Sequence, residues 1–202
     1  MFGDLGFANG RLASSTEMNW NAMADATEDQ PAIDGQSTTT PTTHIREYEW
    51  IDPDLLMDAT NRLGGLEMLK EVRAGMLPRP PVMDTIGFDL LSVEQGRVTF
   101  EMVPQRWHYS PLGLVHGGVL TTLADTAMGC AVHSRLPVGV GYATLEVKLN
   151  FVRPVVEETG PIRCEGEVLS LGRRSATAQA RITDLDGKLH GHATTTCMIL
   201  TI

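Results

Sequence analysis

The sequence predicts an α+β protein in which one antiparallel sheet curls around a single long helix. Six segments alternate apolar with polar residues, as strands do, and they form a group of two followed by a group of four. One helical pattern separates the two groups. This order excludes a repeated strand–helix–strand architecture, because helices would then alternate with strands throughout. With 202 residues, of which 42% are hydrophobic, the chain is large enough for one good core but not for two full domains.

The first part of the chain predicts a tail followed by a helical cap. Residues 1–43 are rich in small and polar residues without a sustained period, so we expect a disordered or extended tail. Asp52 and Pro53 are typical of a helix start, and a pair of glycines separates this helix from a second one that stops at residues 78–81. We therefore assign residues 44–81 to a cap. The apolar residues at helical spacing are Leu55, Leu56, Ala59 and Leu63, then Leu66, Leu69 and Val72.

Residues 82–202 are expected to form the main domain. It begins with a hairpin whose turn lies at Gln95 and Gly96, and a loop from Pro104 to Val115 then leads into the long helix. No further helical pattern follows that helix, which predicts that the rest of the domain is sheet. The expected strands lie near residues 88–93, 98–102, 140–153, 161–171, 174–183 and 188–201, and the helix spans residues 117–133.

The predicted helix has two unlike faces. Its wide apolar face consists of Leu120, Leu123, Ala124, Ala127, Met128 and Ala131. On the opposite face, Gly118, Thr122, Asp125 and Gly129 recur at spacings of four, three and four residues. Small residues on one helix face permit a close neighbour, so we expect a second helix to approach there. Asp125 is the only charged residue of this helix, and a lone carboxylate on an apolar helix suggests a chemical role.

The net charge of −9 is concentrated in the first third of the chain. Residues 1–72 contain 13 acidic and 4 basic residues, whereas residues 73–202 contain 12 of each. A chain with a pI near 5.1 and no basic stripe is not expected to bind nucleic acid. A phosphorylated small molecule remains possible, because it needs only a few local arginines.

Other signals predict neither a membrane segment nor a metal site. No apolar run is long enough to cross a membrane, and the N-terminus lacks the order of a secretory signal, so we expect a soluble cytoplasmic protein. The three cysteines are far apart in the sequence, which fits buried thiols better than a disulfide framework. His190 and His192 have no third ligand at a suitable spacing, and we expect no bound metal.

The long helix opens with the motif His116-Gly117-Gly118, and Asp125 follows Gly117 by eight residues. This motif, inside a helix that is followed only by strands, resembles the hotdog-fold acyl-coenzyme A (acyl-CoA) thioesterases of the PaaI-like, phenylacetate-pathway type. The resemblance covers about residues 82–202 and implies a hotdog fold, with the sheet wrapped around the helix and short helices before it. It also implies hydrolysis of acyl-CoA thioesters without a cofactor, since coenzyme A is part of the substrate.

The resemblance assigns roles to five residues. Gly117 would donate its N–H to the thioester oxygen, and Asp125 would act as nucleophile or general base. A helix N-terminus suits the first role, because its unpaired N–H groups and partial positive charge stabilise a developing oxyanion. His116 would fix the loop by hydrogen bonding. Thr144 lies where some relatives hold the attacking water with a serine, and Ser110 replaces an asparagine that many relatives carry.

Four further residues are expected to bind the coenzyme A part of the substrate. Arg153 precedes a proline, and Arg173 and Arg174 lie in a predicted turn; these positions resemble those that meet the coenzyme's phosphates. Gly118 is expected to lie beside the substrate at the helix start. Which acyl group is hydrolysed stays open between aromatic, medium-chain and other acyls.

The spacing of Gly117 and Asp125 predicts a homodimer. Eight residues of helix separate them by about 12 Å along the axis, yet both must reach one thioester. Two antiparallel helices would bring Gly117 of one chain beside Asp125 of another, and such dimers are expected to assemble into a tetramer.

The main alternative to a thioesterase is a non-catalytic acyl-CoA-binding module, which Ser110 favours because many relatives carry an asparagine there. A hydratase is disfavoured, because Gly129 and Cys130 stand where that chemistry needs a histidine.

Overall fold

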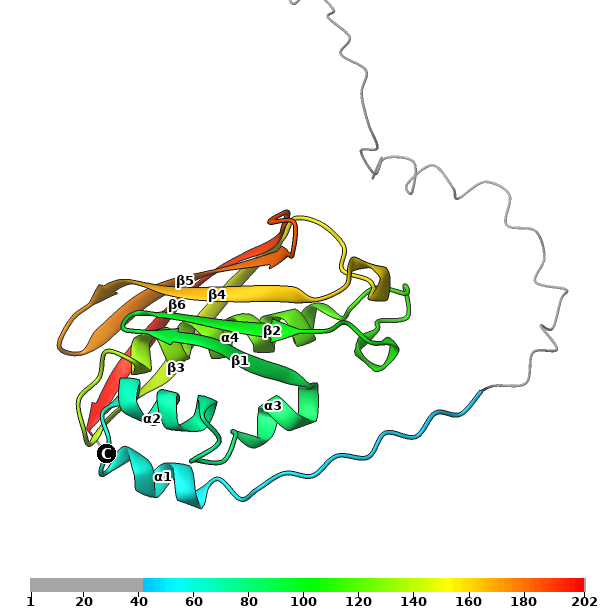
Figure 1. Cartoon of the computed structure of the whole chain (residues 1–202). Helices are drawn as coiled ribbons and strands as arrows, with labels where there is room; N and C mark the ends of the chain where they lie inside the picture. Colours follow the sequence, from blue (N-terminus) through cyan, green and yellow to red (C-terminus); the bar gives the residue numbers. More distant parts are fainter. Residues whose placement is uncertain (1–41, 202) are drawn as a thin grey trace, which may run out of the picture. The chain divides into compact units, whose positions relative to one another are not determined.

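A computed structural model describes residues 42–201, so almost all of the predicted tail lies outside the described residues (Figure 1). The chain divides into two units, Met1–Ile45 and Arg46–Ile202. All helices and strands of the described residues lie in the second unit, and the description below concerns that unit alone. No helix among the described residues is long and apolar enough to cross a membrane.

The cap contains three short helices, one more than the sequence predicts. The two expected helices are α1 (Asp54–Thr60) and α2 (Gly65–Arg73). The third, α3 (Pro81–Ile86), lies where the sequence predicts the end of the helical region. Pro81 starts this helix instead of ending the helical region, because proline is tolerated in the first turn of a helix. Gly87 ends the helix in the left-handed conformation, with φ 88°. The helix therefore crosses the predicted boundary between cap and main domain.

The main domain is one six-stranded antiparallel sheet, as the sequence predicts. Its strand order is β1-β2-β4-β5-β6-β3, so the first strand and the third form the two edges. All six strands lie within a few residues of their predicted positions. The strands are β1 (Phe88–Glu94), β2 (Arg97–Met102), β3 (Val140–Phe151), β4 (Ile162–Leu171), β5 (Ser175–Asp184) and β6 (Leu189–Thr201).

The sheet curls around helix α4 (Gly117–His133), which confirms the predicted hotdog architecture (Figure 1). All six residues of the predicted apolar face are buried. The helix lies directly on β4: a Cβ atom added at Gly166 would be 2.2 Å from the Ala127 carbonyl oxygen. Glycine at this position therefore allows the helix and the sheet to approach each other closely.

The small-residue face of α4 is only partly open, which corrects the expectation that a second helix packs along all of it. A Cβ atom added at Gly129 would lie 2.3 Å from the Tyr142 hydroxyl, so the chain's own strand β3 fills this space. Gly118 is exposed, and Thr122 is half-buried. The first half of the face is therefore available to another molecule, whereas Tyr142 covers the second half.

Candidate active site

Asp125 and Thr144 come together between the helix and the edge strand. The Thr144 hydroxyl donates a hydrogen bond of 2.8 Å to Oδ1 of Asp125, and both residues are half-buried. A hydrogen bond to a carboxylate is stronger than one between neutral groups, and it fixes the orientation of the acid. One oxygen of Asp125 is thereby held by the protein.

A β-bulge in β3 turns Thr144 toward the helix. Strand β3 pairs with β6 along its whole length, but the register shifts between Thr144 and Glu146 and leaves Leu145 unpaired. Simple alternation would place Leu145 on the same face as Val147 and Leu149, which pack against the core, yet Leu145 is 60% exposed. Bulges often re-aim side chains beside active sites, and this one brings Thr144 to Asp125.

The motif residues form the N-terminal end of α4. His116 is the N-cap residue, and its Nδ1 accepts a hydrogen bond of 2.9 Å from the Gly118 N–H. The His116 N–H donates to the His108 carbonyl at 2.8 Å, which ties the helix start to the preceding loop. Among the residues that the structure describes, the Gly117 N–H donates to no acceptor. The helix start thus presents one unpaired donor.

Phe151 covers this helix start, although its position in the sequence does not mark it as a site residue. A Cβ atom added at Gly117 would lie 2.8 Å from Cζ of the Phe151 ring, although the side chain is itself 56% exposed. Glycine at position 117 therefore lets an aromatic ring lie directly against the helix end. The sequence places Phe151 in a strand, but only the register of β3 brings it to Gly117.

Two titratable side chains beside Asp125, those of Cys130 and Tyr142, are uncharged at neutral pH. Burial and then the Asp125 carboxylate raise the pKa of the Cys130 thiol to about 12. Burial, with smaller effects of Cys130 and Asp125, holds the pKa of Tyr142 well above its usual value. Neither group ionises near pH 7, so Cys130 is not a thiolate nucleophile, and Asp125 is the candidate catalytic group of this cluster.

Ser110 lies in the loop before the helix. Its N–H donates to the Leu114 carbonyl at 2.7 Å, and its carbonyl accepts from Gly113 at 3.0 Å, which closes a tight turn. Within residues 42–201, no hydrogen bond joins the Ser110 side chain to Gly117 or Asp125. Its predicted role in catalysis stays a prediction.

The predicted phosphate-binding arginines do not meet within one chain. Arg153 follows the end of β3, and its Nη1 donates to the Leu189 carbonyl at 2.6 Å. Arg173 and Arg174 are exposed and precede β5, which runs in the same direction as β3 because each is antiparallel to β6. The end of one strand and the start of the other lie at opposite ends of the sheet. One chain therefore cannot hold one phosphate with all three.

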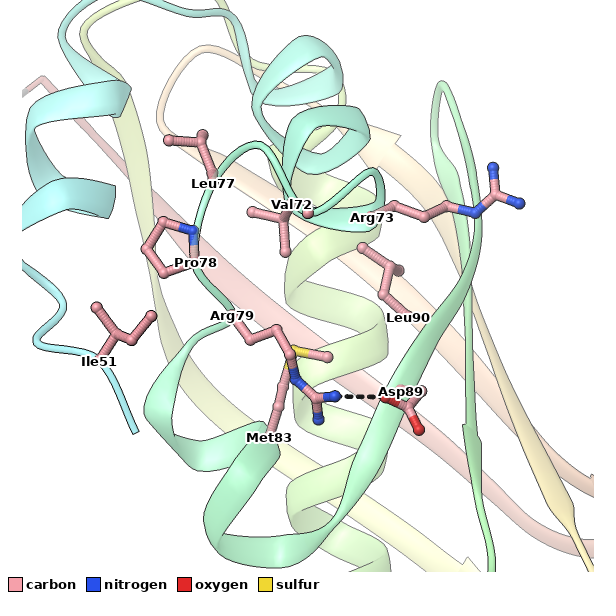
Figure 2. Close-up of a pocket in the computed structure, with 10 residues that line it drawn as sticks. Ile51, Val72, Arg73, Leu77, Pro78, Arg79, Met83, Asp89 and Leu90 are labelled. Atoms are coloured by element: carbon pink, nitrogen blue, oxygen red, sulfur yellow. Dashed lines mark hydrogen bonds and ion pairs between the residues drawn. The ribbon is translucent and has the colours of Figure 1, made fainter. Parts of the chain in front are cut away.

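A separate pocket lies between the cap and β1 (Figure 2). Its volume is about 380 Å³, and its walls are mostly apolar. Figure 2 shows the Arg79 guanidinium directed at Asp89, with an N–O distance of 2.6 Å. Gly117, Asp125 and Thr144 do not line this pocket, so it is not part of the site built around them. The residues lining it are Ile51, Val72, Arg73, Gly75, Leu77, Pro78, Arg79, Met83, Asp89 and Leu90.

Comparisons with known proteins agree with this architecture. The thioesterase superfamily model matches residues 112–190, which include the helix and its motif. A protein of Saccharolobus solfataricus that is named as an esterase is 30% identical over 105 residues, which are 52% of this chain and 72% of that protein. The 1,4-dihydroxy-2-naphthoyl-CoA hydrolase of Listeria monocytogenes is 25% identical over 108 residues, 54% of this chain and 86% of that enzyme.

Solved structures give the same result. A thioesterase of Ralstonia eutropha, described as related to phenylacetic acid degradation, is 29% identical with a TM-score of 0.59, and the match covers 64% of this chain and 98% of that one. The chain therefore belongs to the thioesterase superfamily and has the hotdog fold of its PaaI-like members. It is a thioester hydrolase, which supports the catalytic interpretation over a non-catalytic binding module.

Proposed function

We propose that this protein hydrolyses acyl-CoA thioesters to a free acid and coenzyme A, at a site that two chains share. The observation that carries the proposal is the Asp125 carboxylate, oriented by Thr144 on a helix whose first N–H has no acceptor within residues 42–201. The similarity to a naphthoyl-CoA hydrolase supports coenzyme A as the thiol part of the substrate.

Two routes are consistent with this arrangement. In the first, Asp125 removes a proton from water, and the resulting hydroxide attacks the thioester carbon. The Gly117 N–H then stabilises the negative oxygen of the tetrahedral intermediate, the C–S bond breaks, and the proton passes to the thiolate. In the second, the carboxylate itself attacks, the C–S bond breaks, and water hydrolyses the resulting anhydride. In both routes the Thr144 hydrogen bond leaves Oδ2 of Asp125 to react.

Three features support a second copy of the chain as part of the site. Gly117 and Asp125 are about 12 Å apart along the helix, at roughly 1.5 Å per residue. The arginines at positions 153 and 173 lie at opposite ends of the sheet, so a second chain is needed to bring them together. Strand β3 is a 12-residue edge with the exposed apolar residues Leu145 and Phe151, and such edges tend to pair with another chain.

Substitution of the acid tests the proposed chemistry. We expect Asp125→Asn to lower kcat/KM on a panel of acyl-CoA thioesters by about 10³-fold, because the amide can neither attack nor accept a proton. Asp186→Asn removes a carboxylate from the exposed β5–β6 turn and serves as the matched control, with unchanged activity expected. If Asp125→Asn retains activity within about threefold of the wild type on every thioester, the proposed role of Asp125 is wrong.

A further inference from the structure

His190 occupies a bulge near the start of β6. Strand β5 pairs Ile182 with Gly191 and Thr183 with Leu189, which leaves His190 as the extra residue. This residue is only 5% exposed, and its carbonyl accepts hydrogen bonds from the N–H groups of residues 152 and 153, at 2.8 and 3.2 Å. The bulge thus directs a buried imidazole at the segment that follows β3.

Both nitrogens of the His190 ring face acceptors. Nδ1 lies 3.0 Å from the Pro154 carbonyl oxygen, and Nε2 lies 3.2 Å from Oδ2 of Asp184. A carbonyl can only accept, so Nδ1 must donate to it. Chiefly the hydrogen bond from the Lys188 N–H, and to a lesser extent the His190 ring, hold the pKa of Asp184 below its usual value, so its carboxylate is ionised at neutral pH.

The segment that His190 holds supports the start of α4. The residue after Pro154 is Val155, whose carbonyl accepts a hydrogen bond of 2.9 Å from the Val115 N–H. Val115 directly precedes His116, the N-cap of the helix. A second contact reinforces this link, because the Tyr109 hydroxyl accepts from the Glu157 N–H at 2.6 Å. Hydrogen bonds and short stretches of backbone therefore connect His190 to Gly117.

We infer that His190 is a positioning residue for thioester hydrolysis, acting through the Pro154 carbonyl to hold the Gly117 N–H where the oxyanion forms. This inference rests on the proposed function, in which Gly117 is the oxyanion donor. An oxyanion donor acts mainly in the transition state, so a displaced donor lowers kcat more than it changes KM.

Two substitutions separate the contacts of the ring. In asparagine the amide nitrogen is as far along the side chain as Nδ1 of histidine, whereas in glutamine it matches Nε2. His190→Asn therefore keeps the donor to Pro154, and His190→Gln keeps the donor to Asp184. We expect His190→Gln to lower kcat about tenfold with KM within about threefold, and His190→Asn to keep kcat within about threefold.

The matched control is His192→Gln. His192 is two residues further along β6, and its nearest hydrogen-bonding partner is Oε1 of Gln179 at 3.4 Å, not the segment after β3. We expect unchanged kinetics for this variant. Amide hydrogen exchange provides a second readout: exchange at residues 115–118 should be faster in His190→Gln than in His190→Asn, at equal thermal stability.

Equal kcat values for His190→Asn and His190→Gln would overturn the inference, because a packing role does not distinguish the two amides. Asp125→Asn, assayed in parallel, separates this failure from a failure of the proposed function. If Asp125→Asn is inactive while both His190 variants match the wild type, only the role of His190 is wrong. If Asp125→Asn is fully active, the proposed catalytic site is itself wrong.

Discussion

The two halves of α4 carry the same pattern of small residues but use it differently. In the second half, the Tyr142 side chain of the same chain occupies the space beside Gly129, which is buried. In the first half, Gly118 is exposed and the Gly117 N–H has no partner among the described residues. A stripe of small residues therefore shows that something approaches a helix closely, but not whether that neighbour belongs to the same molecule.

The largest effect on stability is expected from filling the space at Gly129. Gly129→Ala places a Cβ atom within 2.7 Å of two ring carbons of Tyr142, and overpacking of this kind costs about 1–3 kcal/mol of the free energy of unfolding. Gly118→Ala meets only the exposed His116 side chain, at 3.0 Å, and should change stability by less than about 1 kcal/mol. Urea unfolding of both variants measures the difference.

A double variant tests the cause of this effect. If Tyr142 is the obstacle, Gly129→Ala in a Tyr142→Val background should cost less than in the wild type, since the ring is gone. Equal costs in the two backgrounds would show that Tyr142 does not set the size limit at position 129.

The next largest effect is expected on kcat, from a change beside Asp125, which lies between the two halves of the helix. Thr144→Val keeps the shape of the side chain but removes the hydroxyl that donates to Asp125. We expect kcat to fall about 10- to 100-fold, because a hydrogen bond to a charged group contributes roughly 1.5–3 kcal/mol. Thr196→Val is the control, since this residue pairs with Glu146 on the far side of the bulge. Unchanged kcat in Thr144→Val would remove Thr144 from the site.

The smallest effect is a pH dependence that distinguishes the two halves. Burial lowers the pKa of His108, whose carbonyl supports the helix start, and also that of His133 at the helix end. A histidine with a lowered folded-state pKa stabilises the fold fully above its unfolded value of about 6.5, and this contribution is lost as the pH falls below that value. Acidification should therefore lower Tm.

Substitution of each histidine measures how much of this loss of stability at low pH it causes. His108→Asn and His133→Asn should each make Tm less sensitive to pH below about 6.5. His108 alone connects to the first half: its Nδ1 accepts from the Gln105 N–H at 3.0 Å, and protonation breaks that bond. The pH profile of activity should therefore differ from that of the wild type at mildly acidic pH in His108→Asn but not in His133→Asn. The same activity profile in both variants would contradict this distinction.

The sequence predicts the strands and the helix well, because period-two and helical patterns report burial on one face directly. It does not predict α3, since a proline-rich stretch is compatible with both a helix start and a chain break. It also misses the bulges at Leu145 and His190. The alternation around Leu145 continues through the bulge, and only pairing with β6 reveals that Thr144 turns inward. For the same reason, the contacts of His190 and Phe151 depend on register between distant strands, which local patterns do not encode.

The central claim is that Gly117 and Asp125 of different chains form one site. Gly117→Pro removes the N–H, and Gly117→Ala, which adds a Cβ but keeps the N–H, controls for contact with Phe151. Neither Asp125→Asn nor Gly117→Pro should be active alone. After denaturation and joint refolding, half of the dimers are mixed and each has one intact site, so about a quarter of wild-type activity should return. No recovered activity, despite mixed dimers detected by native mass spectrometry, would contradict the account.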